Sequence, residues 1–199
     1  NVVVTLEPPP APIITEPDDG VIFEGGPIMC RGTSEPFVPM KLRRDGFVVG
    51  GVTPESDGTF EITDISLLEG DNAFTATAED SVGQSGVSNV VHVTLDSESP
   101  EAPQLLNLRV VLGEGISVRW DYADTGERPA FFRLYRHTAP FVSTDEATLL
   151  ADNLTELLYQ DIGLNDGTYY YGVVGVDGVG NISPLSSILS AEYDGTLPA

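Results

Sequence analysis

The stretch TYYYGVVGVDGVGNISPLS, residues 168–186, decides the fold that we expect for this chain. Its first half is rich in aromatic and β-branched residues, which favour strands, and its second half is rich in glycine, which favours turns. We therefore predict a strand over residues 168–177 that ends in a turn. Period-two alternation puts four residues on its buried face: Tyr169, Tyr171, Val173 and Gly175. A slip of one residue would bring Tyr170 inward instead, and we favour Tyr169.

Similar segments extend through the chain on both sides of this stretch. Short apolar runs bounded by turn residues recur about every 8 to 12 residues, a spacing typical of β-sandwiches. In the first half we predict seven strands, at residues 12–15, 27–33, 39–44, 46–52, 59–63, 72–79 and 88–95. In the second half we predict seven more, at residues 106–112, 115–122, 130–137, 147–151, 156–161, 168–177 and 186–193.

One short helical turn is the exception that we predict in an otherwise all-β chain. Ser143 and Glu146 have the spacing of a capping box, so a turn of helix near residues 143–149 can bridge two strands.

The alternation also predicts the core. In the second half we place five further residues inward: Ile116, Val118, Trp120, Phe132 and Leu134. In the first half, Cys30 is the only cysteine of the chain, so no intramolecular disulfide can form, and we interpret it as a small buried apolar residue.

A repeated phrase indicates where domains join. The stretch NVVHVTLDSESPEAP at residues 89–103 is nearly matched by NVVVTLEPPPAP at residues 1–12. We interpret each as the last strand of a domain followed by an extended linker, because acids and prolines keep a segment hydrated and unpaired. Residues 1–10 would then be the end of a preceding domain with a proline-rich linker, and residues 196–199 the start of a following linker.

Two stretches resemble known families. Residues 11–97, with DGTF and LLEGDNAFTATAEDSVGQSG, resemble bacterial Ig-like repeats. Residues 103–195, with ISVRW, FRLYR and YQDIGLNDGTYYYGVVGVDGVGNISPLS, resemble a bacterial fibronectin type III domain. The resemblance implies two tandem Greek-key β-sandwiches joined by a linker at residues 98–102. It also implies that Tyr169 is the tyrosine corner of the second sandwich.

Charge excludes several partners. The chain has 31 Asp and Glu against 9 Lys and Arg, a formal net charge of −22. Nucleic acid is excluded as a partner because phosphate binding needs clustered basic residues. The sequence shows no apolar window long enough to span a membrane and no signal peptide, so we expect no direct membrane insertion.

The sequence predicts no enzyme activity. His92 and His137 are the only histidines, and neither lies in a metal-binding or nucleophile motif. A pair of carboxylates could in principle serve glycoside hydrolysis, but small sandwiches offer no deep cleft for the substrate.

Calcium is the one cofactor that the sequence suggests, and none is required. In a seven-strand sandwich, two acidic loop clusters are expected to lie at the junction of the domains. The ligands that we predict there are Glu69, Asp71, Asp96, Glu98, Asp124 and Asp177, with Asp121 and Glu127 beside them. The alternative is a hydrated acidic linker on a chain that is acidic throughout.

A second candidate site is a surface patch of the second domain. If Phe132 and Leu134 point inward, four other residues point outward on neighbouring strands: Phe131, Arg133, Tyr135 and Tyr170. Aromatic residues and arginine are enriched at binding hot spots. The alternative is cross-strand pairing with a cation–π contact that stabilises the sheet.

The resemblance implies a non-catalytic spacer, presentation or adhesion segment of a larger bacterial protein that is secreted or on the cell surface. Its partners would be neighbouring domains of the same polypeptide. One alternative is an accessory module of a secreted carbohydrate-active enzyme. Another is a module that binds a glycan or a protein through the patch of the second domain.

Overall fold

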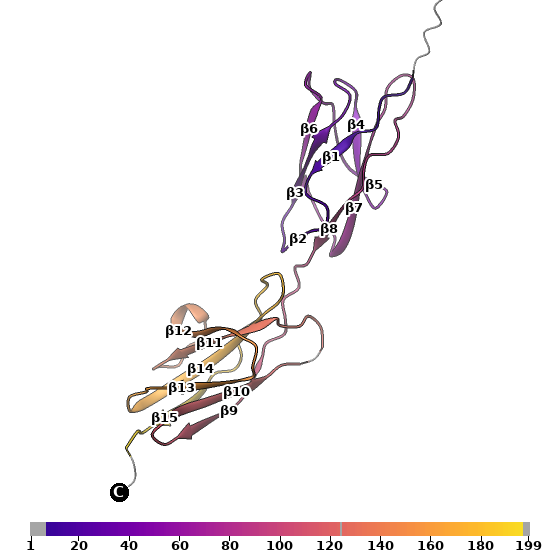
Figure 1. The fold of residues 1–199 in the computed structure, drawn as a ribbon. Helices are drawn as coiled ribbons and strands as arrows, with labels where there is room; N and C mark the ends of the chain where they lie inside the picture. The colour runs from indigo at the N-terminus through magenta and orange to yellow at the C-terminus, as the bar shows by residue number, and fades with distance from the viewer. Residues whose placement is uncertain (1–6, 124, 197–199) are drawn as a thin grey trace, which may run out of the picture. The chain divides into compact units, whose positions relative to one another are not determined.

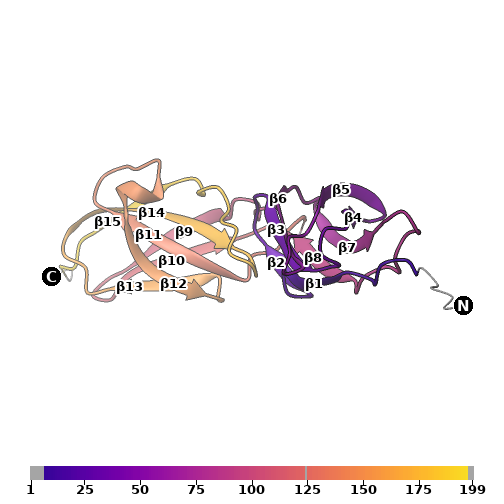
Figure 2. The ribbon, with the colours of Figure 1, turned by 90° about the horizontal axis from the view of Figure 1, so that it is seen from above.

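The computed structural model describes residues 7–123 and 125–196. The strand predicted near the start of the chain, at residues 1–6, therefore lies outside the described residues. The chain divides into two compact units, residues 1–97 and residues 98–199, and each is described by itself. Figures 1 and 2 show that each unit is a sandwich of β-sheets.

From residue 7 onward, the described part of unit 1 contains eight strands in two sheets. One sheet has the order β1-β3-β6 and the other β2-β8-β7-β4-β5 (Figure 1). The strands are β1 (Ile13–Glu16), β2 (Val21–Phe23), β3 (Ile28–Thr33), β4 (Met40–Arg44), β5 (Phe47–Val52), β6 (Thr59–Ile65), β7 (Gly70–Ala78) and β8 (Val91–Leu95).

The sequence prediction missed β2. After β1 pairs with β3 in one sheet, the chain crosses to the other sheet, where β2 pairs in parallel with β8. β2 has three residues, which is too short for alternation to show in a sequence. The first sandwich therefore has eight strands rather than the seven predicted.

Apolar residues from both sheets form the core of unit 1. Its members include Leu42, Phe74 and Val93, none more than 1% exposed. Cys30 is fully buried among them and makes no disulfide. Burial raises the pKa of its thiol to about 12, so the prediction of a small buried apolar residue is confirmed.

In the part of unit 2 that the structure describes there are seven strands and one short helix, as predicted. Its sheets have the orders β13-β10-β9 and β12-β11-β14-β15 (Figure 1). The elements are β9 (Gln104–Val111), β10 (Gly115–Asp121), β11 (Phe131–His137), η1 (Thr144–Glu146), β12 (Thr148–Leu154), β13 (Leu158–Ile162), β14 (Gly167–Val176) and β15 (Leu189–Tyr193). No helix of the described residues is long and apolar enough to cross a membrane.

The helical turn differs from a capping box in both bonds, because that motif would join the Ser143 side chain to the backbone N–H of Glu146 and the Glu146 side chain to that of Ser143. The Ser143 side chain accepts a hydrogen bond from the Asp145 backbone N–H, as an N-cap should. The Glu146 carboxylate, however, accepts from the backbone N–H of Val142 rather than from that of Ser143. The turn is therefore closed one residue earlier than the sequence spacing suggests.

The frame predicted for strand β14 is correct. Tyr171 and Val173 are fully buried, and Gly175 lies opposite Phe132 of β11. The Tyr169 ring is also buried, and its hydroxyl donates to the Asn165 carbonyl oxygen at 3.0 Å. This backbone bond a few residues upstream is the tyrosine corner that the resemblance implied.

Candidate functional site

A buried polar cluster joins the two sheets of unit 2. Asp161 of β13 is 3% exposed, and its two carboxylate oxygens accept from Arg136 Nη1 of β11 at 2.8 and 2.9 Å. The Tyr171 hydroxyl of β14 donates to the same carboxylate at 2.6 Å. Burial, followed by the bond to Asp161, raises the pKa of Tyr171 above its ordinary value. Every member has a partner, so we interpret the cluster as structural.

The sequence did not reveal this cluster. β13 alternates between exposed and less exposed residues, and Asp161 is a carboxylate at an inward position. That position becomes acceptable only because Arg136 and Tyr171 reach it from the opposite sheet. No local signal in the sequence identifies such partners.

Two of the three predicted calcium ligands of unit 1, Glu69 and Asp71, have carboxylates that contact partners within that unit. The Glu69 carboxylate accepts from the Ser97 backbone N–H at 3.1 Å and from the Ser97 hydroxyl at 2.7 Å. The Asp71 carboxylate lies 3.0 Å from His92 Nδ1. Asp96 is half-buried, and its backbone N–H donates to the Phe23 carbonyl oxygen.

In unit 2, Asp177 closes its own loop. It is 2% exposed, and one carboxylate oxygen accepts from the backbone N–H groups of Val179, Gly180 and Asn181 at 2.7–2.9 Å. The other accepts from Asn181 Nδ2 at 2.9 Å. Burial acts to raise the pKa of Asp177, but these bonds outweigh it and hold the pKa below its usual range. The turn therefore explains this buried carboxylate without a metal.

The remaining predicted ligands are less constrained. Asp124 lies outside the described residues, so the prediction for it stays open. Glu98 is exposed, and its carbonyl oxygen accepts from Asn181 Nδ2 at 3.2 Å. A carboxylate oxygen of Glu127 lies within 4.8 Å of one of Asp177.

The predicted surface patch is half-buried. Phe131, Arg133 and Tyr135 alternate on the outer side of β11, and Tyr170 lies on the same side of β14. The Arg133 guanidinium lies 5.5 Å from the centre of the Phe131 ring, and its Nε is 3.1 Å from the Asp152 carboxylate. These are the contacts that the sheet-stabilising alternative predicts.

Apolar residues also cover the middle of this outer face. A Cβ built on Gly172, which lies opposite Tyr135, would be 2.7 Å from Ile188 and 2.9 Å from Leu185. Val174 and Val176 of the same strand are each 2% exposed. β14 is thus covered on both faces, and the open part of the patch is limited to its margins.

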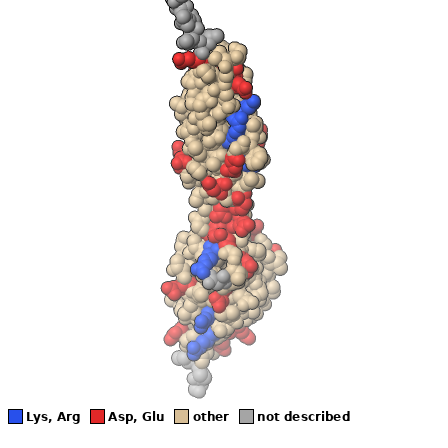
Figure 3. All heavy atoms as spheres, turned by 90° about the vertical axis from the view of Figure 1, so that its right-hand side faces the viewer, with Lys and Arg blue, Asp and Glu red and all other residues tan. Residues whose placement is uncertain are grey.

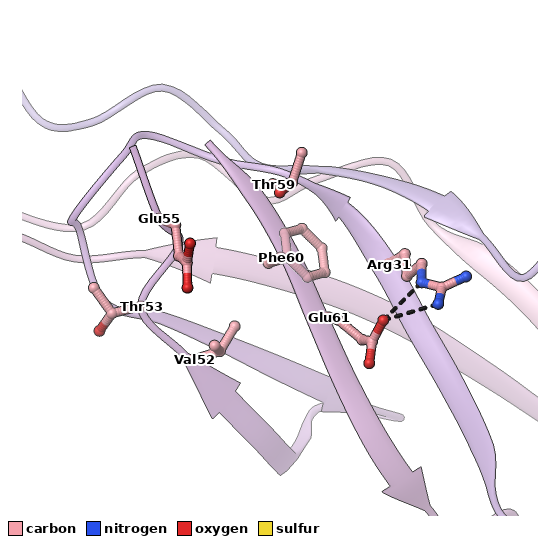
Figure 4. A pocket seen from close by; sticks show the side chains of 7 residues that line it. All are labelled: Arg31, Val52, Thr53, Glu55, Thr59, Phe60 and Glu61. Atoms are coloured by element: carbon pink, nitrogen blue, oxygen red, sulfur yellow. Dashed lines mark hydrogen bonds and ion pairs between the residues drawn. The ribbon is translucent and has the colours of Figure 1, made fainter. Parts of the chain in front are cut away.

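A hollow of about 360 Å³ opens between β5 and β6 of unit 1 (Figure 4). It is lined by Arg31, Val52, Thr53, Glu55, Thr59, Phe60 and Glu61. The Arg31 guanidinium forms ion pairs with Glu61 at 2.9 Å and with Glu16 at 3.1 Å. Its hydrogen bonds to Glu61 and then to Glu16 raise the pKa of Arg31 above its ordinary value. Because Glu61 is committed to this pair, the lining residues lack the two free carboxylates that glycoside hydrolysis uses.

Comparison with known proteins places the fold. No protein family matches the chain in a scan. Bacillopeptidase F of Bacillus subtilis (strain 168) is 32% identical over 90 residues, which are 45% of this chain and 6% of that protein. The chain therefore spans a small part of this curated relative.

Solved structures match nearly the whole chain. Domains A168–A170 of titin have a TM-score of 0.62 at 12% identity, over 94% of this chain and 68% of that one. The FN1–FN3 domains of chicken CNTN1 have a TM-score of 0.52 at 15% identity, over 93% of this chain and 65% of that one. The fibronectin(III)-like modules of Clostridium thermocellum CbhA have a TM-score of 0.46 at 17% identity, over 92% of both chains.

The likenesses to the titin and CNTN1 domains agree with the β-sandwich fold of the two units. At such low identity they concern the fold and leave the function open. The chain therefore has the all-β fold of an Ig-like sandwich followed by a fibronectin type III sandwich.

Proposed function

We propose that this chain is a non-catalytic segment that spaces or presents other domains of a larger extracellular bacterial protein. The observation that carries the proposal is the match to Bacillopeptidase F, in which 90 similar residues make up only 6% of that protein. A segment that forms a small share of a long chain is typical of a module that positions other domains.

The contents of the two units support this proposal. The buried polar groups Asp161 and Asp177 are satisfied by partners in their own unit, which is what a stable scaffold needs. The fully buried Cys30, whose pKa is raised, lacks the thiolate character of a nucleophile. The peptidase activity in the relative's name belongs to that protein.

An accessory role beside a catalytic domain is the second candidate. The name of the relative, a peptidase, supports it, because an accessory module of an enzyme would also be a small part of a long chain. A carbohydrate-active enzyme is the class that the sequence resemblance suggested.

Turnover assays test the non-catalytic proposal. The purified chain is incubated with fluorogenic peptides and with dye-labelled polysaccharides, and product is followed against a buffer blank. We expect no product above the blank. Turnover that survives repurification, and that disappears when the chain is unfolded and returns when it is refolded, would contradict the proposal.

A glycan array with the same chain tests binding through the patch of Phe131, Arg133, Tyr135 and Tyr170.

A further inference from the structure

Two arginines of unit 2 differ from most basic residues of the chain. Arg109 of β9 and Arg119 of β10 are exposed, and in the part of the chain that the structure describes neither guanidinium makes a hydrogen bond or ion pair. Carboxylates are abundant in a chain with 31 Asp and Glu, and they spread over the surface that Figure 3 shows. Arginines without a carboxylate partner are therefore unexpected here.

Strand register puts both arginines on one face. Val118 and Trp120 point into the core, so Arg119 points outward from the sheet β13-β10-β9. Arg109 lies opposite Ser117, two residues before Arg119 on β10. The two arginines are therefore diagonal neighbours, a relationship in which Cα atoms are about 7–8 Å apart.

The cross-strand neighbours of Arg119 and Ser117 on this face carry no carboxylate. Arg119 lies between Asn107 of β9 and Leu158 of β13, and Ser117 lies between Arg109 and Gln160. The next outward residue along β10 is Asp121, whose Oδ1 accepts from the Tyr122 backbone N–H.

Apolar side chains flank the arginines. Leu158 is 48% exposed and Ile162 is 70% exposed, and both lie on the outward side of β13, which is an edge strand. Gln160 between them donates to the Ser117 hydroxyl at 3.1 Å. The face thus combines two arginines with exposed aliphatic side chains. Protein interfaces likewise combine an apolar centre with arginine, which is enriched in them.

We propose that this face, defined by Arg109, Arg119, Leu158, Gln160 and Ile162, binds an acidic protein segment. The segment carries two carboxylates about two residues apart in an extended backbone, with aliphatic side chains beside them. The carboxylates pair with the two arginines, and the aliphatic side chains cover Leu158 and Ile162. This surface lies on the sheet opposite to the patch of β11 and β14 and goes beyond a spacing role.

Charge favours a protein segment over a polyanionic polysaccharide. Residues 98–199 carry 15 acids and 5 bases, so a long polyanion that extends past the two arginines meets a repulsive surface. Aliphatic contacts also add nothing to the binding of a uniformly charged polymer. A short acidic segment avoids both costs.

A peptide titration tests the proposal. The probe is the capped heptapeptide Leu-Thr-Glu-Thr-Glu-Thr-Leu, in which both leucines and both glutamates share one side of an extended chain. Backbone amide signals of the 15N-labelled chain are followed by NMR at low salt. We expect shifts confined to β9, β10 and β13, and weaker binding when glutamine replaces both glutamates.

Two double variants provide the matched comparison. R109Q/R119Q should weaken peptide binding about tenfold, as expected when hot-spot arginines are lost. R31Q/K41Q removes the same two charges from exposed ion pairs of unit 1 and should leave binding within about twofold. Equal binding by both double variants, no binding of the peptide by the natural chain, or stronger binding of polygalacturonate than of the peptide to the same strands would each overturn the proposal.

Discussion

The Tyr171 hydroxyl donates a 2.6 Å hydrogen bond to the buried carboxylate of Asp161, and this bond connects the two sheets of unit 2. Arg136 Nη1 donates to the same carboxylate at 2.8 Å. A carboxylate buried at an inward strand position would be costly alone, and two side chains from two other strands offset that cost. The bond is therefore one of the determinants of how the two sheets pack.

Substitution of Tyr171 tests the contribution of this bond. Tyr171→Phe removes the hydroxyl but keeps the ring, and leaves Asp161 with Arg136. We expect it to lower the free energy of unfolding of unit 2 by about 1.5 kcal/mol, the lower end of the range for a hydrogen bond to a charged group. Urea unfolding followed by the fluorescence of Trp120, the only tryptophan, reports on unit 2. Tyr170→Phe, on the outer side of the same strand, is the control. It should change the free energy of unfolding of unit 2 by less than about 0.5 kcal/mol. An equal effect of both substitutions would contradict the role of the bond.

Substitution of Arg133 and of Arg119 should affect stability to different extents. Arg133 pairs with Asp152 and lies over the Phe131 ring, so Arg133→Ala should cost about 1 kcal/mol. Arg119 has no such partner in the described structure, so Arg119→Ala should change stability by less than about 0.5 kcal/mol. The same Trp120 fluorescence measures both. If Arg119→Ala costs as much as Arg133→Ala, Arg119 has a stabilising contact that the structure does not show.

The raised pKa of the Cys30 thiol predicts that the stability of unit 1 depends on pH. Its folded pKa is about 12, above its ordinary value of 9.0, so the folded state keeps a proton that the unfolded state releases. Its contribution to stability is therefore complete below pH 9.0 and is lost as pH rises toward 12.

Chemical unfolding followed by circular dichroism at several pH values measures this loss of stability. The variant Cys30→Ala is the comparison. The variant should be less stable at neutral pH because it leaves a small cavity, but its stability should fall less between pH 9.0 and 12. Parallel pH profiles for the two proteins would show that the thiol is not the cause. In the natural chain, a thiol reagent at pH 8 should react with Cys30 only after unfolding.

Calcium is expected to have little effect on either unit. Glu69 is bonded to Ser97, Asp71 to His92, and Asp177 to its own loop, so each carboxylate has a partner before any metal is added. We expect the same Tm in EDTA and in millimolar Ca²⁺, measured by circular dichroism. A rise in Tm with Ca²⁺, absent for Mg²⁺ and lost in Glu69→Gln or Asp96→Asn, would instead support the predicted calcium site.

Alternation predicted what depends on one strand at a time. Trp120, Phe132, Leu134 and Tyr171 are inward as predicted, because a residue's face follows from its position along its own strand. The burial of Cys30 was predicted from its position along its own strand, and the lack of an intramolecular disulfide from the absence of a second cysteine.

The features that depend on several strands could not be predicted. β2 is defined by its pairing with β8, and Asp161 by the reach of Arg136 and Tyr171. The exposed pair Arg109 and Arg119 emerges from the register of β9 against β10, which fixes their neighbours. A sequence lists these residues but not the distances between them.

Replacement of the chain within its parent protein tests the central claim most directly. The 199 residues are exchanged for an unrelated pair of sandwich domains of similar length, and separately deleted. Presentation or activity of the flanking domains is then measured. A spacing role predicts that the unrelated pair restores the natural level while the deletion does not. Failure of the unrelated pair, together with rescue by the natural chain, would contradict spacing and assign a specific binding function to these residues.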